Sequence, residues 1–105
     1  MHDYQEKRLH PRRRMETKVV FEDEFGDGLF YVRSKDISLG GLFLESEIPV
    51  RVGTMLFLNF ALPGRKRPVR VTGEVMRVAG SGVGIRFVGF TEKAKSKIIK
   101  FLTKR

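Results

Sequence analysis

Hydrophobic and polar residues alternate along much of the chain, beginning near Met15. Val19 and Phe21 alternate with polar neighbours, a Phe-Gly-Asp-Gly turn follows at 25–28, and the segment 29–35 is rich in aromatic and β-branched residues. Alternation with a period of two is typical of a strand with one buried face. The pattern therefore predicts two strands joined by a turn.

Four further strands are predicted downstream. A short one covers 42–45 after two glycines, a longer one covers 54–62, and the segments 69–79 and 83–90 pair across a Gly-Ser-Gly turn. The segment 54–62 is apolar on both faces, as expected for a strand buried on two sides or closed into a barrel. Short strands with Gly-rich turns are typical of small antiparallel barrels. We therefore expect an all-β fold, a six-stranded antiparallel barrel of split, Greek-key-like type.

The end of the chain has helical periodicity instead, and Thr91 is a suitable N-cap. Apolar residues recur along one helical face: Ala94, Ile98, Phe101 and Leu102. Lysines occupy the other side: Lys93, Lys97, Lys100 and Lys104. This pattern predicts a helix over about 91–104 that packs on the barrel with its lysines in solvent. The alternative is a helix that binds the surface of an anionic membrane.

Residues 1–14 show no apolar periodicity, only charge and one proline, and are predicted to form a flexible basic arm. The remainder, 15–105, is long enough for one domain and too short for two. The longest mostly apolar stretch, 55–62, falls far short of the roughly 20 residues that a membrane helix needs. With no secretory signal and no cysteine, the sequence predicts a cytoplasmic protein without a disulfide framework.

The charge balance of the sequence bears on its binding partners: 21 Lys and Arg outnumber 12 Asp and Glu and give a formal net charge of +9. The basic residues gather in the arm, around the turn at 65–70 and in the C-terminal segment. Such a balance predicts an anionic partner: nucleic acid, a nucleotide, an anionic membrane or an acidic protein surface. Charge alone does not choose among them.

Two short motifs carry the candidate chemistry. In the arm, Arg8 and Arg12 are separated by three residues; later, Asp36, Ser38 and a glycine pair, Gly40-Gly41, follow the second strand. Arginine binds phosphate and the O6/N7 edge of guanine in a bidentate manner, and a carboxylate accepts from the other guanine edge. Ser38 can donate to a phosphate or cap the turn, and the glycines permit close approach to a ligand or a positive φ.

Each motif has a simpler interpretation when it is taken alone. Arginines in a basic tail are usually solvated charge, and an Asp-x-Ser sequence before two glycines is usually a side-chain-stabilised turn. The combination of both motifs at this distance, with a six-strand barrel and a terminal helix, favours a guanine-nucleotide site.

This combination resembles the PilZ domain, the bacterial receptor module for cyclic di-GMP. Arg8 and Arg12 match the first family motif, and Asp36, Ser38 and Gly41 match the second. The resemblance implies a six-stranded barrel, here 15–105 with its C-terminal helix, that binds the dinucleotide on its outer face. The arm would lie over the ligand with its arginines on guanine and phosphate, while the aspartate and the serine contact a guanine.

The strand Gly82-Val83-Gly84-Ile85-Arg86-Phe87 and the following helix also resemble the family, so that nearly all of 6–105 is covered. The family associates the position before the first motif arginine with binding of one or two ligand molecules; here it is Lys7. Lys7, Arg13 and Arg86 are possible additional contacts.

Other basic residues have two interpretations each. Arg14, like Arg13, is either a phosphate contact or solvated charge, and Arg33 and Arg77, like Arg86, either line the binding face or point outward as ordinary strand residues. His10 is interpreted as an incidental arm residue. The phenylalanines are predicted to form the core rather than a stacking platform for bases: Phe30, Phe43, Phe57, Phe60, Phe87 and Phe90.

Catalysis finds no support, because the chain has no cysteine, histidine only in the arm, and no carboxylate pair beside a nucleophile. No metal and no cofactor beyond the cyclic di-GMP ligand are expected. The resemblance implies output through an unidentified effector protein in motility, biofilm or secretion control. The rival interpretations are a small basic nucleic-acid-binding barrel, which the strand aromatics disfavour, and a protein adaptor that binds no ligand.

Overall fold

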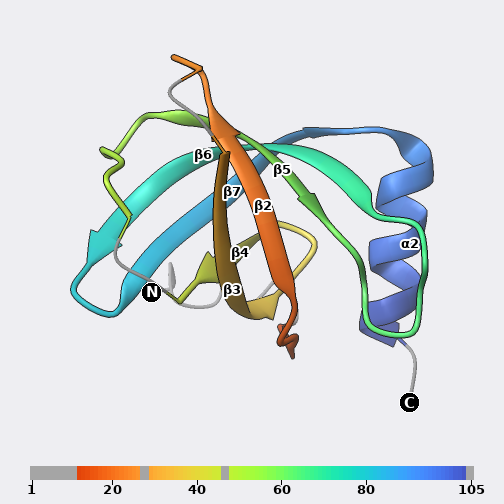
Figure 1. Cartoon of the computed structure of the whole chain (residues 1–105). Helices are drawn as coiled ribbons and strands as arrows, with labels where there is room; N and C mark the ends of the chain where they lie inside the picture. The colour runs from red at the N-terminus through yellow and green to blue at the C-terminus, as the bar shows by residue number, and fades with distance from the viewer. Residues whose placement is uncertain (1–11, 27–28, 46–47, 104–105) are drawn as a thin grey trace, which may run out of the picture.

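Short antiparallel strands make up most of the computed structural model, which describes residues 12–26, 29–45 and 48–103. In these residues seven strands precede one helix (Figure 1): β1 (Arg13–Arg14), β2 (Lys18–Asp23), β3 (Leu29–Ile37), β4 (Gly41–Leu44), β5 (Met55–Phe60), β6 (Val69–Ala79), β7 (Gly82–Phe90) and α2 (Glu92–Thr103). The predicted strands are therefore found, with ends shifted by a few residues.

Six of the strands close into a barrel. Around the ring the order is β3, β2, β5, β6, β7 and β4, and β4 pairs again with β3, so that every neighbouring pair is antiparallel. A closed ring leaves no free sheet edge for pairing with another chain. The structure confirms the predicted six-stranded barrel with a C-terminal helix.

Strand β1 is an extension of β2 rather than a seventh member of the ring. Arg13 pairs with Ile37 and Arg14 pairs with Asp36, on the same edge of β3 that β2 occupies further along. The predicted arm, 1–14, lies largely outside the described residues, but its last two residues belong to the sheet. A run of arginines has no apolar alternation, so this pairing left no pattern in the sequence.

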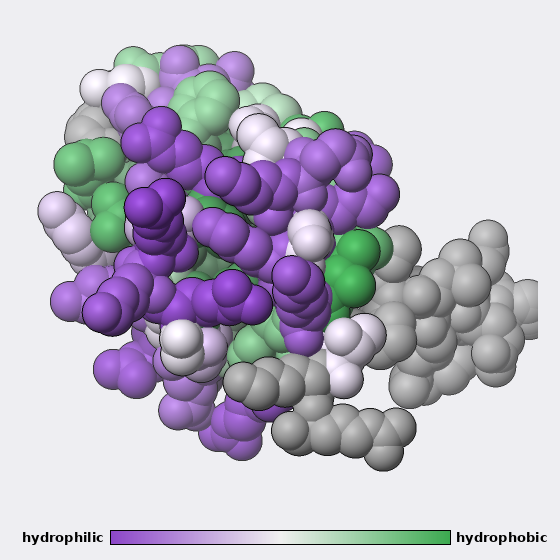
Figure 2. All heavy atoms as spheres, turned by 90° about the vertical axis from the view of Figure 1, so that its right-hand side faces the viewer, coloured by the Kyte–Doolittle hydropathy of each residue, from purple (hydrophilic) through white to green (hydrophobic). Residues whose placement is uncertain are grey.

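Helix α2 packs beside β6 at one side of the barrel, on the right in Figure 1. Its first turn is capped as predicted, because the Ala94 amide donates to Oγ1 of Thr91 at 3.0 Å. Ala94 and Ile98 are buried, whereas Lys93 and Lys100 are exposed. Figure 2 looks at this side and shows hydrophilic side chains over most of it. Among the described residues, no helix has both the length and the apolar character needed to cross a bilayer.

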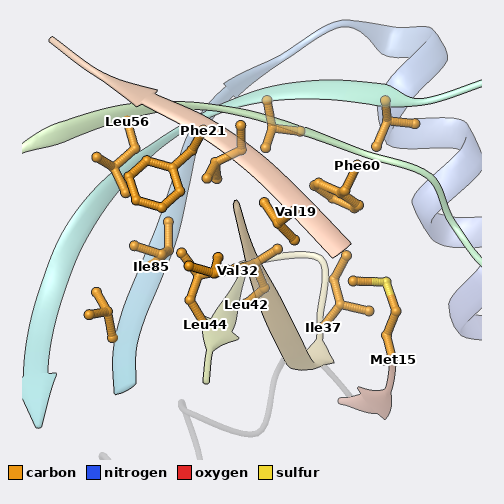
Figure 3. Close-up of a cluster of buried hydrophobic side chains, with 14 of the residues drawn as sticks. Met15, Val19, Phe21, Val32, Ile37, Leu42, Leu44, Leu56, Phe60 and Ile85 are labelled. Atoms are coloured by element: carbon orange, nitrogen blue, oxygen red, sulfur yellow. The ribbon is translucent and has the colours of Figure 1, made fainter. Parts of the chain in front are cut away.

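The core fills the barrel with alternate residues from each strand (Figure 3). On β5 the side chains of Leu56, Leu58 and Phe60 are at most 2% exposed, and the residues between them face outward. Of the two alternatives for 54–62, a strand buried on two sides or a strand closed into a barrel, the structure therefore shows the second. Because the barrel encloses a single core, one face of each strand meets that core and the other meets the outer surface.

The predicted aromatic core is only partly correct. Phe60 is buried, and Phe30, Phe87 and Phe90 are partly buried against the core. Phe57, in contrast, is 49% exposed because it lies on the outer side of β5. Phe43 is half-buried, but it alternates with the core residues Leu42 and Leu44 and so faces outward from β4. The aromatic buried near the start of the barrel is Phe21, which stacks on Phe30 with centroids 5.0 Å apart.

Adjacent isoleucines on α2 provide a test of its packing. Ile98 is fully buried and Ile99 is 38% exposed. We expect Ile98→Ala to lower the free energy of unfolding by about 2–5 kcal/mol, because it leaves a cavity between helix and barrel. Ile99→Ala is the matched control and should change it by less than about 1 kcal/mol. Urea denaturation followed by circular dichroism measures both, and equal losses would contradict the described packing.

Candidate functional site

One outward row of residues crosses four neighbouring strands of the barrel. Asp36 of β3 is paired with Phe43 of β4, Phe43 with Gly84 of β7, and Gly84 with Arg77 of β6. Directly paired residues of antiparallel strands project on the same side of the sheet. Since Phe43 faces outward, the carboxylate, the phenyl ring and the guanidinium all lie on the outer surface.

A second row runs beside the first. Gly41 of β4 is paired with Arg86 of β7, which is paired with Glu74 of β6. Arg86 donates through Nη2 to Oε1 of Glu74 at 2.7 Å, and the Arg77 guanidinium carbon lies 5.9 Å from the centre of the Phe43 ring. We call the outward surface formed by both rows the site face: Asp36, Gly41, Phe43, Arg77, Gly84 and Arg86. Two of its members are glycines, of which Gly41 is buried and Gly84 is half-buried.

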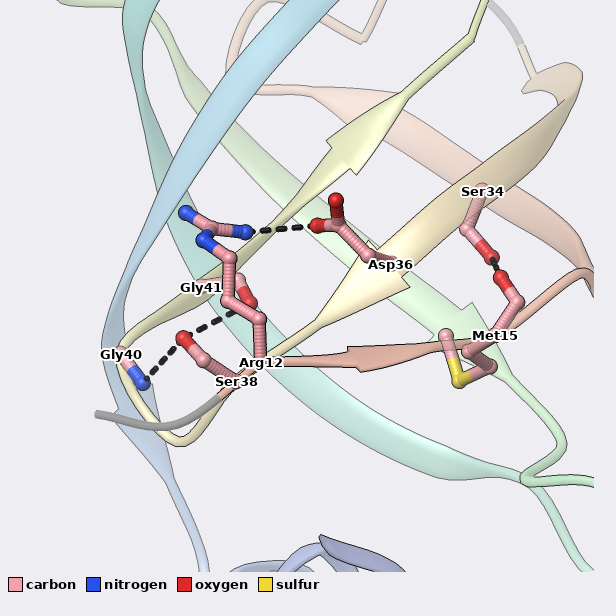
Figure 4. Close-up of polar contacts among 7 residues, drawn as sticks. All are labelled: Arg12, Met15, Ser34, Asp36, Ser38, Gly40 and Gly41. Atoms are coloured by element: carbon pink, nitrogen blue, oxygen red, sulfur yellow. Dashed lines mark hydrogen bonds and ion pairs between the residues drawn. The ribbon is translucent and has the colours of Figure 1, made fainter. Parts of the chain in front are cut away.

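The turn between β3 and β4 is held by Ser38, which is buried (Figure 4). Its hydroxyl accepts from the Gly40 amide at 3.1 Å and donates to the Gly41 carbonyl at 3.4 Å, while its own amide donates to that carbonyl at 2.8 Å. The hydroxyl thus performs the turn-capping role considered from the sequence. A contact between Ser38 and a guanine stays a prediction. Asp36 was expected in the turn, but it belongs to the end of β3.

Gly41 is required by the closeness of β4 and β7. A Cβ atom built on it would lie 2.0 Å from the carbonyl oxygen of Ile85, a backbone atom that cannot move aside locally. The Phe87 amide also donates to the Gly40 carbonyl at 2.8 Å, which fastens the turn to β7. Neither glycine of the pair has a positive φ, so that part of the expectation is wrong. The close approach is instead made by the protein's own neighbouring strand.

Arg12 brings the arm motif to the site face. Its Nη1 donates to Oδ1 of Asp36 at 2.6 Å, with side-chain exposures of 58% and 28%. The contact follows from the pairing of β1 with the end of β3 (Figure 4). An ion pair this open to solvent contributes only about 0.2–1 kcal/mol. The structure therefore joins one residue from each motif; Arg8 and Lys7 lie outside the described residues.

Arg13 lies on the other side of β1 and contacts the end of α2. Its guanidinium donates to the Phe101 carbonyl and lies 4.3 Å from the centre of the Phe101 ring. Arg14 projects to the same side of the strand as Arg12, and its Nη2 donates to Oε2 of Glu16 at 2.8 Å. In the structure, then, the Arg13 side chain is directed to α2, whereas Arg14 lies opposite Asp36 in the pairing of β1 with β3 and forms its side-chain ion pair with Glu16.

Sequence reasoning did not place Phe43 on the site face, and it left Arg77 undecided. Both reach Asp36 only because the barrel closes, since β4 and β7 lie between β3 and β6. The available signal was the alternation of Phe43 with Leu42 and Leu44. A concavity of about 620 Å³ lies elsewhere, on β2, β5 and β6, and includes no motif residue. In the described residues, no three His, Cys, Asp or Glu side chains are grouped as metal ligands.

Comparison with known proteins gives a family and three solved structures. The model of the PilZ domain matches residues 6–104. The Bacillus subtilis inhibitor of motility (MotI/DgrA) aligns with a TM-score of 0.78 at 16% identity over 93% of this chain, which spans only 53% of that one. The PilZ domain of CeSA, from a cellulose-synthesizing bacterium, gives 0.71 at 14%, covering 87% of this chain and 93% of that one.

The third structure is the PilZ domain of Escherichia coli YcgR with cyclic di-GMP. It aligns with a TM-score of 0.71 at 14% identity, covering 91% of this chain and 88% of that one. At such identities these likenesses show the fold. The search of curated proteins found no match.

Two glycines allow a test of the close approach in the site face. Gly41→Ala should lower the free energy of unfolding by about 1–3 kcal/mol or more, because its new methyl group meets the Ile85 carbonyl. Gly80→Ala is the matched control, since no atom lies within 4 Å of the added Cβ. Thermal and urea denaturation measure both variants. A Gly41 variant as stable as the Gly80 variant would show that β4 and β7 are not so close.

Proposed function

Because the chain belongs to the PilZ domain family, we propose that it is a non-enzymatic, cytoplasmic receptor for cyclic di-GMP whose binding site is the site face together with the arm. The observation that carries the proposal is the Arg12–Asp36 contact, which joins the two motifs on one surface. Neither motif alone requires a nucleotide. Together they provide a hydrogen-bond donor suited to phosphate, Arg12, beside a hydrogen-bond acceptor suited to guanine, Asp36.

The chemistry of the site face fits a guanine dinucleotide. Asp36 can accept from N1–H and N2–H of guanine, while the arginines, Arg12, Arg77 and Arg86, can donate to phosphate or to O6 and N7. The outward Phe43 ring offers a stacking surface, and Gly84, where an added Cβ would come no closer than 3.8 Å to the neighbouring strand, lets a planar base come close to the backbone. Ser38 supports this arrangement by fixing the turn.

Binding exchanges one ionic contact for several. A nucleotide that uses both Arg12 and Asp36 must break their mutual contact, which is worth only about 0.2–1 kcal/mol at this exposure. Hydrogen bonds to charged groups contribute about 1.5–3 kcal/mol each. The exchange therefore favours the complex, and the cation-rich surface adds long-range attraction that weakens as salt rises.

A route from the ligand to a protein partner begins at Arg13. Consecutive strand residues face opposite sides, so Arg12 contacts the site face while Arg13 contacts Phe101 near the end of α2. A shift of the arm on binding would move both contacts together. We infer that α2 reports the state of the arm to an effector protein.

The arginines of the arm give the first test. Arg12→Ala and Arg8→Ala should each weaken cyclic di-GMP binding by about 10- to 100-fold, the loss of one charge-assisted contact. Arg51→Ala, which removes the same charge from an exposed residue outside both the arm and the site face, is the control. Isothermal titration calorimetry measures affinity, and circular dichroism checks the fold. Unchanged affinity in both motif variants, or single-stranded DNA bound more tightly than the nucleotide, would refute the proposal.

The proposed route through Arg13 has its own test. In the wild type, cyclic di-GMP should change the hydrogen-exchange protection of the last turn of α2. Arg13→Ala should abolish that change while binding the nucleotide nearly as well, because its side chain lies on α2 rather than beside Asp36. Arg51→Ala again serves as the control. The same protection change in wild type and Arg13→Ala would exclude this route.

A further inference from the structure

Five cationic side chains converge on one cleft between α2 and the turn that joins β5 to β6. Three come from the turn and two from the helix: Arg65, Lys66, Arg67, Lys93 and Lys97. The cleft has a volume of about 330 Å³, and among the residues that the structure describes these five line it. Helix α2, which forms one wall of it, lies at the right of Figure 1. We call it the basic cleft.

The charges of the basic cleft are not balanced by the protein around it. Within the described residues, the ion pairs involve Arg12, Arg14 and Arg86, and none of the five. No carboxylate of the described residues lines the cleft, and Lys93 and Lys97 are like charges one helical turn apart, an arrangement that destabilises a helix. Like charges gathered on one surface repel one another, and an anion that binds among them relieves this repulsion.

We propose that the basic cleft is the docking site for an acidic segment of a protein partner. This inference deepens the proposed function, on which it rests, by naming the chemistry of the effector. Carboxylates match the planar fork of arginine, and lysines add adaptable donors around them. Between the charged ends, the aliphatic stems of five long side chains form apolar walls. The cleft therefore fits a segment in which Asp or Glu alternates with apolar residues.

The lining favours this occupant over the other polyanions. Single-stranded nucleic acid binds on aromatic platforms, and none of the five described lining residues is aromatic. A membrane-binding surface inserts apolar side chains between lipid headgroups, and none of these five is an apolar residue. The surface is concave rather than flat, so a protruding peptide segment can enter the cleft, whereas the flat surface of a bilayer cannot.

Helix α2 connects the basic cleft to the arm. Lys93 and Lys97 lie in its first half, and Phe101 near its end is held by Arg13. A helix moves as a rigid element, so a change at its last turn alters the position of its lysines relative to the turn of β5 and β6. The partner surface and the proposed ligand sensor thus share one element of structure.

A labelled peptide of alternating Glu and Leu tests the cleft, with the Gln–Leu peptide as the uncharged control. Fluorescence anisotropy should show that Lys93→Glu/Lys97→Glu weakens binding of the acidic peptide at least about tenfold. Glutamate is a good helix former and suits the first turns of α2, so the fold should persist. The matched control is Arg33→Glu/Arg51→Glu, which makes the same charge change at two exposed residues outside the cleft. This control should lose far less affinity.

Each other outcome overturns the inference. Equal losses in the two double variants would mean that only net charge matters. Tighter binding of inorganic polyphosphate, DNA or phosphatidylglycerol vesicles, lost in the Lys93/Lys97 variant, would make the occupant a phosphate polyanion. Nucleotide titration of the same proteins separates the two proposals. If cyclic di-GMP still binds when the acidic peptide does not, the cleft alone is refuted; if the peptide binds and the nucleotide does not, the proposed function is refuted.

Discussion

The closure of the barrel by β4 is the constraint on which the site depends. This strand has only four residues, yet it pairs with β3 on one side and with β7 on the other. The pairing with β7 is so close that a Cβ on Gly41 would lie 2.0 Å from a backbone oxygen. Without this closure Asp36 and Arg86, fifty positions apart in the sequence, would not share a surface. The short strand thus brings residues from distant segments onto one outward surface, the site face.

Strand alternation in β1 gives the protein a second property. Arg12 and Arg13 are chemically identical neighbours, but pairing with β3 directs one toward Asp36 and the other toward Phe101. The first contact is exposed and weak, and the second joins an ion to a backbone carbonyl and an aromatic face. A ligand that captures the weak contact would therefore act on a segment that also holds the helix. Under the proposed function, this arrangement would link ligand recognition to output within two residues.

Most of the fold could be predicted because its strands alternate strongly and its turns contain glycine and proline. The helix was equally clear, down to the Thr91 cap. The incorrect predictions concern residues whose local sequence pattern does not show which side of the closed barrel they face. Phe57 is as apolar as Phe60, and the two differ only in the side of β5 on which they project: Phe60 faces the core and Phe57 faces the outer surface. β1 was not predicted because two arginines carry no alternation.

The sequence allowed the two motifs of the candidate site to be identified, but not the other residues that share their surface in the folded barrel. Asp36, Ser38 and Gly41 stood out because aspartate, serine and glycine each have a specific use near a nucleotide. The reason for Gly41 was different from either expectation, since the strand it accommodates is the protein's own β7. Phe43 and Arg77 could not be assigned from local sequence, because only the ring of strands places them beside the motif.

The central claim is that cyclic di-GMP binds where β3, β4 and β7 meet. The most direct measurement is a nitrogen–proton correlation spectrum of the labelled protein during titration with the nucleotide. The account predicts that the largest shift changes fall on the amides of Gly40, Gly41, Gly84 and Arg86, with the outer wall at Phe57 and Asn59 little affected. Changes centred on that wall, or no changes at saturating nucleotide, would contradict it.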